Sequence, residues 1–354
     1  MSKSIALQTL LSKIKDTKIV SAVSGSALYI GTHDGSFHCD EVFAISMLKC
    51  LPEYADATVV RTRNPDVLAQ CNIVVDVGAV YDPATHRYDH HQREFTGVMP
   101  NYNTKLSSAG LVFKHFGNSV LSSIVAHSVP TTDASHSRLV GILQDKVYKG
   151  FVEHIDAIDN GIAVAEGEIK YHISTTLSNR VGHLHPAWNE KSTREQMDER
   201  FREAMYLVAA EFVPFVDRLV NVWWPARSIV ERAMAARAEV HPSQRILVLP
   251  QACPWKDHIF DIEEELAING VTVPTLYVLF EDTTGGSWRV QCVPENAASF
   301  TNRRSILSAH CGLRDDALSE ACKIPGCVFV HASGFIGGNK TKDGALKMAI
   351  NSLE

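Results

Sequence analysis

Histidine and aspartate side chains gather in three short segments, each at a place where a buried strand is expected to end. In chain order the residues are His33, His38, Asp40, Asp76, Asp89, His90 and His91. Imidazole and carboxylate groups without sulfur suit Mn²⁺ or Mg²⁺ better than a structural zinc ion. Because open α/β sheets hold their ligands at the carboxyl ends of strands, the three segments are expected to converge on one site with two ions.

Two divalent ions at such a site predict a particular chemistry. Ions about 3.5–4 Å apart need a carboxylate that binds both, and Asp76 ends the central segment, where it could do so. A water held by both ions is acidified and can attack phosphorus in line, while the ions neutralise charge on the phosphate oxygens. The segments therefore predict hydrolysis of a phosphate ester or diester.

The elements expected around these residues alternate between strand and helix. Strands are expected over 27–31, 57–61 and 73–77, and helices over 40–51 and 65–70. This alternation predicts an α/β fold with a mainly parallel sheet and helices on both faces.

A helix expected to begin near residue 108 follows the third segment. Thr104 or Ser107 is its candidate cap, and its N-terminal amides could face an anion. Ser108, beside this cap, is a candidate phosphate-binding residue. The stretch 117–138 lacks a periodic apolar pattern and is expected to be a variable connection, after which 140–159 is expected to be helical and to end at Asn160-Gly161.

The C-terminal part has fewer helices between its strands, which predicts a smaller α+β lobe with a mixed or antiparallel sheet. A long amphipathic helix over 192–220 precedes it, and residues 192–195 fit a capping box. The expected parts are an N-terminal arm or transit segment (1–26), a metal-binding catalytic domain (27–190), a connecting helix (191–223) and a substrate-closing domain (224–354).

A glycine-rich segment, 331–341, lies between the last expected strand and a helix. Glycines let backbone amides approach an anion, although the Walker pattern is absent. The candidate phosphate-binding residues here are His331, Ser333, Gly334, Gly337, Gly338 and Lys340. Arg289, Arg303 and Arg304, together with Lys340, could line a groove for a nucleic-acid backbone.

Composition narrows the function class. The net charge of −6 over 354 residues argues against sequence-blind coating of duplex nucleic acid. Eight cysteines without a CxxC pair indicate reduced thiols of an intracellular protein. No apolar run approaches the ~20 residues that cross a bilayer, so no membrane partner is expected. The acid-free residues 1–15 resemble a transit peptide but lack arginine, which favours a surface helix or a mobile arm.

Five motifs resemble those of a known family. They are GTHDGSFHCDE (31–41), YDHHQREF (88–95), KLSSAGLV (105–112), DAIDNGI (156–162) and HASGFIGGNKTKDGAL (331–346). They are similar to the melanocyte-proliferating-gene family, often labelled metal-dependent protein hydrolase, within the DHH phosphoesterase superfamily. The resemblance runs from about Tyr29 to Lys347. It implies a two-lobed DHH fold and a 3′–5′ RNA exonuclease that acts in the nucleus and the mitochondrion.

The resemblance also implies how the ligands are shared between the ions. His33 and His38 would bind one ion, Asp40 and His90 would bind the other, and Asp76 would bind both. The superfamily usually has aspartate where this chain has His38, which lowers the negative charge of the site.

Further roles come from the same resemblance. Asp89 and His91 would orient His90 or contact the phosphate. One more ligand is expected from a later aspartate, and both Asp156 and Asp159 remain candidates.

Three functions stay open on the sequence alone. The first is a 3′–5′ exoribonuclease with two divalent cations, Mn²⁺ being favoured over Mg²⁺, and single-stranded RNA as substrate. The second keeps the chemistry but acts on pyrophosphate, a nucleotide or a cyclic dinucleotide, since no aromatic-rich stacking strand or long basic run is present. The third is a metal-binding scaffold without turnover. The oligomeric state is not indicated.

Overall fold

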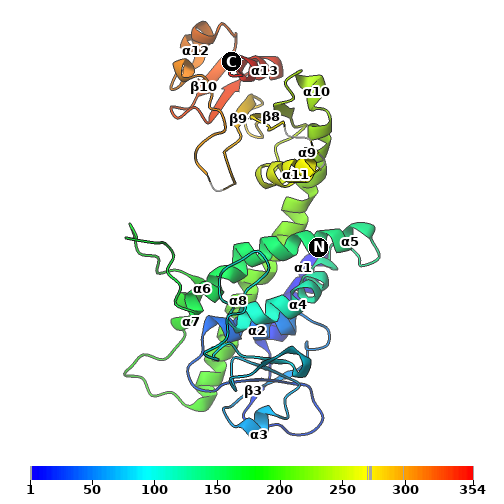
Figure 1. Cartoon of the computed structure of the whole chain (residues 1–354), viewed down its shortest axis with the longest axis vertical. Helices are drawn as coiled ribbons and strands as arrows, with labels where there is room; N and C mark the ends of the chain where they lie inside the picture. Colours follow the sequence, from blue (N-terminus) through cyan, green and yellow to red (C-terminus); the bar gives the residue numbers. More distant parts are fainter. Residues whose placement is uncertain (1, 269, 271–272, 298, 354) are drawn as a thin grey trace. The chain divides into compact units, whose positions relative to one another are not determined.

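The computed structural model describes residues 2–268, 270, 273–297 and 299–353, and in it the chain forms two compact units (Figure 1). The first unit ends at Asn221 and the second begins at Val222. Each has its own sheet, six-stranded in the first unit and five-stranded in the second. The α/β class is as predicted. None of the helices in the described residues is long and apolar enough to cross a membrane.

The sheet of the first unit is parallel except at one edge. Its strands are β1 (Ile19–Val20), β2 (Tyr29–Thr32), β3 (Thr58–Arg61), β4 (Ile73–Val75), β5 (Tyr81–Asp82) and β6 (Arg87–Tyr88). Their order is β1-β3-β2-β4-β6-β5, and β5 alone is antiparallel to its neighbour. From β2 the chain goes to β3 on one side and then crosses to β4 on the other. Ligands of open α/β sheets bind at such a reversal, beyond the carboxyl ends of the strands.

The helices of the first unit are arranged mostly on one face of this sheet. They are α1 (Ser2–Lys15), α2 (Cys39–Lys49), α3 (Pro65–Leu68), α4 (Ser108–Val125), α5 (Ala134–Val147), α6 (Glu153–Asp159), α7 (Leu177–Gly182) and α8 (Arg194–Arg218), with the short 3-10 helix η1 (Pro83–Thr85) and the π-helical segment η2 (Tyr148–Val152). A second π-helical segment, η3 (Leu219–Trp223), contains the boundary between the two units. Helix α2 packs between the sheet, α4 and α8 and is buried along its whole length. Its middle turns are largely apolar and belong in such a core, while the charged Asp40, Glu41 and Lys49 stand at its two ends.

The other face of the sheet has little helical cover. Leu68 of α3 joins Tyr29, Val60 and Val74 in a hydrophobic cluster there. Helices were predicted on both faces of the sheet. They cover one face, whereas the other has only the four-residue helix α3.

The N-terminal residues belong to the first unit. Helix α1 packs against α8, with Ile14 fully buried, and β1 pairs with β3. Residues 2–26 therefore contribute a helix and an edge strand to this unit.

Helix α4 continues to Val125 and α5 begins at Ala134, so the stretch 117–138, predicted to be a connection, is one only over 126–133, and the prediction was wrong for the rest. Val120, Leu121 and Ile124 are buried on its inner side, while its serines and asparagine interrupt the apolar pattern. Gly117 permits close packing, since a Cβ there would lie 3.0 Å from the Gln144 side chain. The helical stretch formed by α5, η2 and α6 then ends at Asp159, as predicted.

The long helix expected over 192–220 is α8, and its capping box is shifted by one residue. The Thr193 hydroxyl accepts from the Gln196 amide, and the Gln196 side chain accepts from the Thr193 amide. The predicted box began at Ser192 and had Glu195 in the partner position. Thr193 is the N-cap residue because it stands immediately before the first helical residue.

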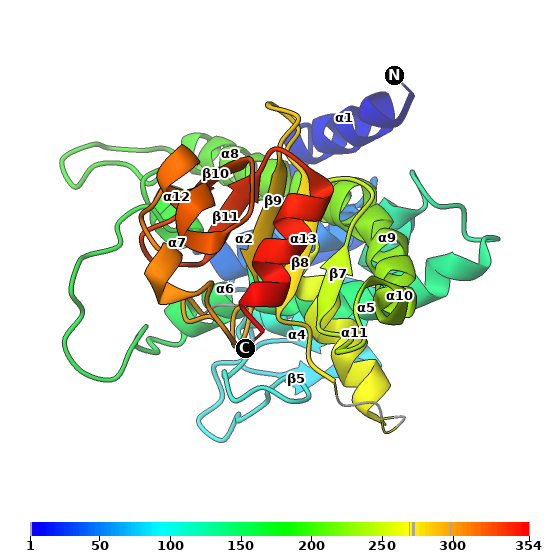
Figure 2. The ribbon, with the colours of Figure 1, turned by 90° about the horizontal axis from the view of Figure 1, so that it is seen from above.

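The second unit has the mixed sheet that the sequence predicts, in the order β10-β11-β9-β8-β7. Only β7 and β8 pair in parallel, and α13 packs on β8, β9 and β11 (Figure 2). Its elements are α9 (Trp224–Ala235), α10 (Arg237–Val240), β7 (Ile246–Val248), α11 (Lys256–Ile268), β8 (Tyr277–Glu281), β9 (Trp288–Cys292), η4 (Ser308–His310), α12 (Asp315–Cys322), β10 (Cys327–Val330), β11 (Ile336–Asn339) and α13 (Lys342–Asn351).

Candidate metal centre

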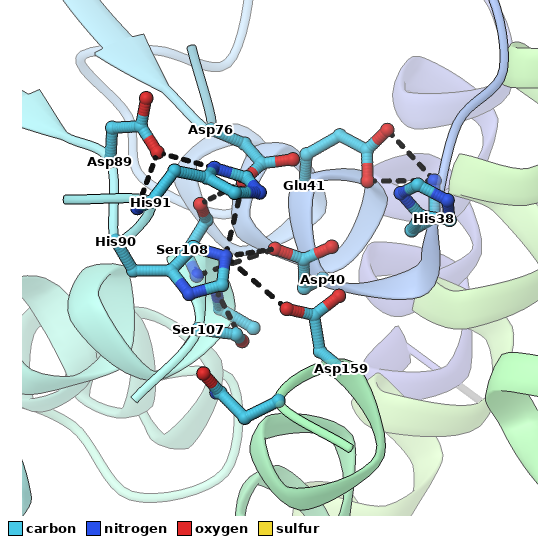
Figure 3. A network of polar contacts seen from close by, with 12 residues as sticks. His38, Asp40, Glu41, Asp76, Asp89, His90, His91, Ser107, Ser108 and Asp159 are labelled. Carbon is cyan, nitrogen blue, oxygen red and sulfur yellow. Dashed lines mark hydrogen bonds and ion pairs between the residues drawn. The ribbon is translucent and has the colours of Figure 1, made fainter. Parts of the chain in front are cut away.

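The three segments converge at the carboxyl ends of β2, β4 and β6 (Figure 3). His33 directly follows β2, Asp76 directly follows β4, and His90 comes two residues after β6. Strand β4 pairs in parallel with both of the others, so the three strand ends lie side by side. This is the convergence that the sequence predicts.

Two groups of ligand atoms lie on either side of Asp76. In the first group, His33 Nε2 is 3.1 Å from Glu41 Oε1 and 3.3 Å from Asp76 Oδ2. In the second, His90 Nε2 is 3.4 Å from Asp76 Oδ1, 3.2 Å from Asp159 Oδ2 and 3.9 Å from Asp40 Oδ2. Asp76 therefore contributes one carboxylate oxygen to each group.

The start of α2 brings two carboxylates into the site. His38 is the N-cap residue, and Asp40 and Glu41 stand in the first turn, where the helix dipole favours negative charge. The exposed His38 ring has a ligand atom within 4.8 Å of those of His33 and Glu41, and also of those of Asp40 and Asp159.

Asp76 points into the site because the backbone turns sharply at the end of β4. Its φ is 58°, in the left-handed region, and Gly78 and Ala79 have φ values of 95° and 52°. A left-handed non-glycine residue costs about 1–2 kcal/mol, and aspartate tolerates it better than most. Ser108 Oγ donates a 2.9 Å hydrogen bond to Asp76 Oδ1. Ser108 is fully buried, so this hydrogen bond is shielded from water and holds the Asp76 carboxylate in place.

Arg61, at the end of β3, holds the loop between β2 and α2 in place. This buried guanidinium donates to Gly35 O at 2.7 Å and to Asp198 at 2.9 Å, and it stacks on Phe201. The end of β3 and helix α8 therefore support the loop that carries His33 and His38.

The cluster concentrates negative charge in a buried place. Burial raises the pKa of Asp40, and the neighbouring carboxylates raise it further. Burial also raises the pKa of Asp159. Burial lowers the pKa of His33, but hydrogen bonds to Asp76 and Glu41 outweigh this effect and raise the pKa to about 10. The site therefore stabilises positive charge at its centre.

The residues fit a pair of divalent cations. Among the described residues, Asp40 Oδ1 and both ring nitrogens of His90 are buried without a hydrogen-bond partner. Buried polar atoms are normally satisfied, so these atoms call for a ligand. Adjacent ligand atoms around an octahedral ion with bonds of about 2.1 Å lie about 3.0 Å apart. The separations of 3.1, 3.3, 3.2 and 3.4 Å in the two groups are close to this spacing.

Asp89 and His91 form a pair at the edge of the cluster. Asp89 Oδ1 is 2.7 Å from His91 Nδ1, and Asp89 Oδ2 accepts from the Ala79 amide at 2.6 Å. Asp89 is buried, whereas the His91 side chain is 60% exposed and its Nδ1 is 3.6 Å from Asp76. Asp89 thus fixes the orientation of the solvent-exposed His91 ring.

The structure separates the two late aspartates. Asp159 lies in the cluster, whereas the Asp156 carboxylate accepts from the Ser107 amide and hydroxyl, the Gly110 amide and the Tyr148 hydroxyl. Burial raises the pKa of Asp156 to about 7. Asp156 supports the first turn of α4.

In the second unit, the three candidate arginines are engaged in structural contacts. Arg289 pairs with Asp282 at 2.6 Å, Arg303 pairs with Glu263 at 2.7 Å, and Arg304 donates to a backbone carbonyl. Such pairing leaves little free positive charge for a nucleic-acid backbone.

The glycine-rich segment is a β-hairpin followed by a helix, rather than the strand–loop–helix element expected. Gly337 and Gly338 are buried within β11, and a Cβ on Gly338 would lie 2.8 Å from the Arg289 guanidinium. Close packing in the sheet therefore accounts for these glycines. Lys340 is exposed beyond the end of β11.

The turn of this hairpin keeps three of the candidates together. His331 Nδ1 lies 2.9 Å from Ser333 Oγ, and Gly334 has a φ of 70° that suits glycine. The turn lies about 13 Å from Lys340, because four residues of strand separate them. The structure therefore does not gather all the expected phosphate-binding residues at one place.

Glu41 is the main residue that sequence reasoning missed. It is fully buried within the cluster. Its position beside Asp40 in the same motif could have indicated a metal ligand. From the sequence it was instead assigned only to the predicted helix.

Two cavities adjoin the cluster, each of about 560 Å³, and His38 and His91 line both. The first is lined on one side by the apolar Phe37, Ile155 and Ile158, and its other lining residues include the polar Gln92, Arg93, Lys105, Asn160 and Ser178. The second includes His33, Asp34, Arg63, Asp76 and Asp89. The cluster is therefore accessible to a substrate.

The chain belongs to the MYG1 family. The model of a family described as an uncharacterised protein family (UPF0160) matches residues 29–353. The human MYG1 exonuclease is 48% identical over 92% of this chain and 85% of its own length. The MYG1 protein C27H6.8 of Caenorhabditis elegans is 48% identical over 92% and 95%, and the MYG1 protein YER156C of Saccharomyces cerevisiae is 40% identical over 97% and 100%. No solved structure matches the chain.

Proposed function

We propose that this chain is a divalent-metal-dependent phosphodiesterase that acts as a 3′–5′ exoribonuclease. The observation that carries the proposal is the position of Asp76, which has one oxygen in each of two groups of ligand atoms. Two-ion phosphoryl chemistry needs such a shared carboxylate. The relatives named MYG1 exonuclease, at 48% identity over most of the chain, favour a nuclease.

In the proposed site, His33 and His38 would hold the first ion, and His90, Asp40 and Asp159 would hold the second. Asp76 would serve both ions, and Ser108 donates a hydrogen bond to its carboxylate. When bound, the ions would acidify a water and neutralise charge on the phosphate, with Mn²⁺ favoured by the imidazole ligands.

His91 is the proposed contact to the phosphate oxygens. Asp89 accepts from its Nδ1 and so orients the ring, which leaves Nε2 directed away from Asp89. Its exposure at the edge of the cluster, where it lines both cavities, suits this role.

The cavity lined by Phe37 and Lys105 is the proposed site of the terminal nucleotide. Its volume of about 560 Å³ lies in the usual range for small-molecule sites. The apolar side chains are the proposed contacts to the base, and Arg93 and Lys105 are the arginine and lysine that line the cavity and are proposed to face a phosphate. A pocket of this size next to the ions favours cleavage from an end of the chain.

A second candidate function is hydrolysis of a small phosphate ester such as pyrophosphate, a nucleotide or a cyclic dinucleotide. The engagement of Arg289, Arg303 and Arg304 in structural contacts favours it, because a long RNA needs free basic side chains along its path.

The test is hydrolysis of single-stranded RNA labelled at either end, with Mn²⁺, by the wild type and Asp76→Asn. The exposed Asp66→Asn is the matched control. Stepwise shortening from the 3′ end by the wild type and control, lost by at least about 10³-fold in Asp76→Asn, is expected. Turnover of small esters without RNA cleavage supports the second function. Bound metal without turnover of any phosphate ester contradicts both.

A further inference from the structure

Glu41 occupies a place in the cluster to which the motif resemblance gives no role. Its carboxylate is fully buried and lies 3.1 Å from His33 Nε2. Figure 3 shows it directed at His38, at the start of α2. Both of its oxygens accept from the His38 backbone amide at 2.9 Å. An ordinary capping-box glutamate needs only this last contact and can remain at the surface.

The His33 ring directs one nitrogen at the Glu41 and Asp76 carboxylates. His33 Nδ1 lies 3.1 Å from the Asp34 carbonyl, which can only accept, so Nδ1 carries the proton in that hydrogen bond. Nε2 therefore faces the Glu41 and Asp76 carboxylates at 3.1 and 3.3 Å. A positive charge must therefore lie among these three atoms. In the metal-free protein it is a proton on Nε2, and a bound metal ion would take the place of that proton.

The charge of the first ligand group also requires another carboxylate. His33 and His38 are neutral when they bind metal, and Asp76 is shared with the second group. Without Glu41, a divalent ion at this position would have half of one carboxylate to balance it. Manganese and magnesium prefer oxygen ligands, and carboxylates above all. Ligand atoms of Glu41, Asp40 and Asp76 all lie within 4.8 Å of one another.

We infer that Glu41 is a direct ligand of the first ion and supplies the negative charge that His38 does not. The His38 amide holds the carboxylate in place through both oxygens, and the ion takes Oε1. Asp40 Oδ1 and the His90 ring nitrogens, buried without hydrogen bonds, are independent signs that cations belong in this cluster. The inference rests on the proposed two-ion site.

The experiment is a Mn²⁺ titration of the metal-free full-length protein by calorimetry and by the electron paramagnetic resonance signal of free Mn²⁺. The variants are Glu41→Gln and Glu41→Asp, and the control is Glu53→Gln, at an exposed glutamate shortly after α2. Two ions are expected to bind the wild type and Glu53→Gln. In Glu41→Gln one of the two sites is expected to lose at least about 100-fold in affinity, and Glu41→Asp, which keeps the charge, is expected to recover part of it.

The outcomes separate this inference from the proposed function. If the wild type binds fewer than two ions, the two-ion site itself fails. If the wild type binds two ions and Glu41→Gln binds both with unchanged affinity, Glu41 is a capping residue only and the inference is overturned. Urea unfolding of the metal-free variants measures the capping contribution. If Glu41→Gln does not fold, the same criterion applies to Glu41→Asp, whose shorter side chain is expected to weaken one site by about tenfold.

Discussion

At the scale of residues, the site depends on a carboxylate whose direction is set by several other groups. Asp76 leaves β4 with a left-handed backbone, and Ser108 holds one of its oxygens. In the proposed two-ion site, Asp76 would share its two oxygens between the ions, and its carboxylate would have little freedom to rotate. Residues behind it therefore affect metal binding without touching an ion.

Ser108→Ala removes the hydrogen bond to Asp76 and is expected to lower Mn²⁺ affinity and the rate of phosphate-ester cleavage by about tenfold. A hydrogen bond to a charged group contributes about 1.5–3 kcal/mol. Ser119, on the exposed side of the same helix, provides the control Ser119→Ala. Metal titration and steady-state kinetics measure both variants. Equal behaviour of the two would show that Ser108 does not support Asp76.

The residue types at the site were predictable, but some of their roles were not. His33, Asp76 and His90 follow strand ends, which the apolar runs before them reveal. Asp156 and Asp159 are three residues apart on one helix, and only the contacts of each distinguish the ligand candidate from the helix support. Glu41 sits in an apolar helix, where the sequence gives no sign of which way its side chain points.

At the scale of elements, the N-terminus of α4 is held by α6. Asp156 of α6 accepts four hydrogen bonds, three of them from the first turn of α4 and its cap. A Cβ on Gly110 would lie 2.3 Å from this carboxylate, so glycine is required for the approach. This contact fixes the position of Ser108.

Asp156→Ala is expected to destabilise the protein by about 3 kcal/mol, because it leaves several buried donors unsatisfied. Asp156→Asn keeps the acceptor for the α4 amides and is expected to cost less. The control is Asp145→Ala, at the end of α5, whose carboxylate accepts from an exposed Tyr102 hydroxyl. Urea unfolding measures the differences. A loss no larger for Asp156→Ala than for Asp145→Ala would refute the support of α4 by Asp156.

Helix α2 contains a buried lysine that makes stability depend on pH. Burial lowers the pKa of Lys49 to about 8, and its amine donates to the Ala57 carbonyl. Between about pH 8 and 10.4 the unfolded chain binds more protons at this residue than the folded one, so its contribution to stability rises with pH.

Lys49→Met removes this titration. The stability of the wild type relative to Lys49→Met is expected to increase from pH 7 to pH 10 by up to about 3 kcal/mol. Urea unfolding of both proteins at several pH values gives the difference, in which other titrating groups cancel. A difference that stays constant with pH would contradict the lowered pKa.

The sequence predicted the central elements better than the peripheral ones. Strands β2, β3 and β4 lie in apolar runs, but β1, β5 and β6 have two residues each, too few to show a period. Gly117 and the serines after it interrupt the apolar pattern of α4, and tertiary packing overrides that interruption. The glycines of β11 were read as a loop because their packing against Arg289 and Met348 depends on distant residues.

At the scale of the whole molecule, every candidate metal ligand lies in the first unit. The second unit contributes the His331 hairpin turn and Lys340 as candidate substrate contacts. Because the first unit has its own core and sheet, the metal binding proposed for it can be tested without the second unit.

A fragment that ends at Asn221 is expected to fold and to bind two Mn²⁺ with the affinity of the full chain. Its cleavage of RNA is expected to fall by at least about tenfold, because the contacts of the second unit are lost. Circular dichroism, metal titration and RNA cleavage test this together. A folded fragment that binds no metal would place essential ligands in the second unit.

The most direct test of the central claim is anomalous diffraction at the manganese edge from crystals grown with Mn²⁺. Two peaks about 3.5–4 Å apart are expected, one within reach of His33, Glu41 and Asp76 and the other within reach of His90, Asp40, Asp159 and Asp76. A single peak, or peaks at which Asp76 contacts neither or only one ion, would contradict a two-ion phosphodiesterase site.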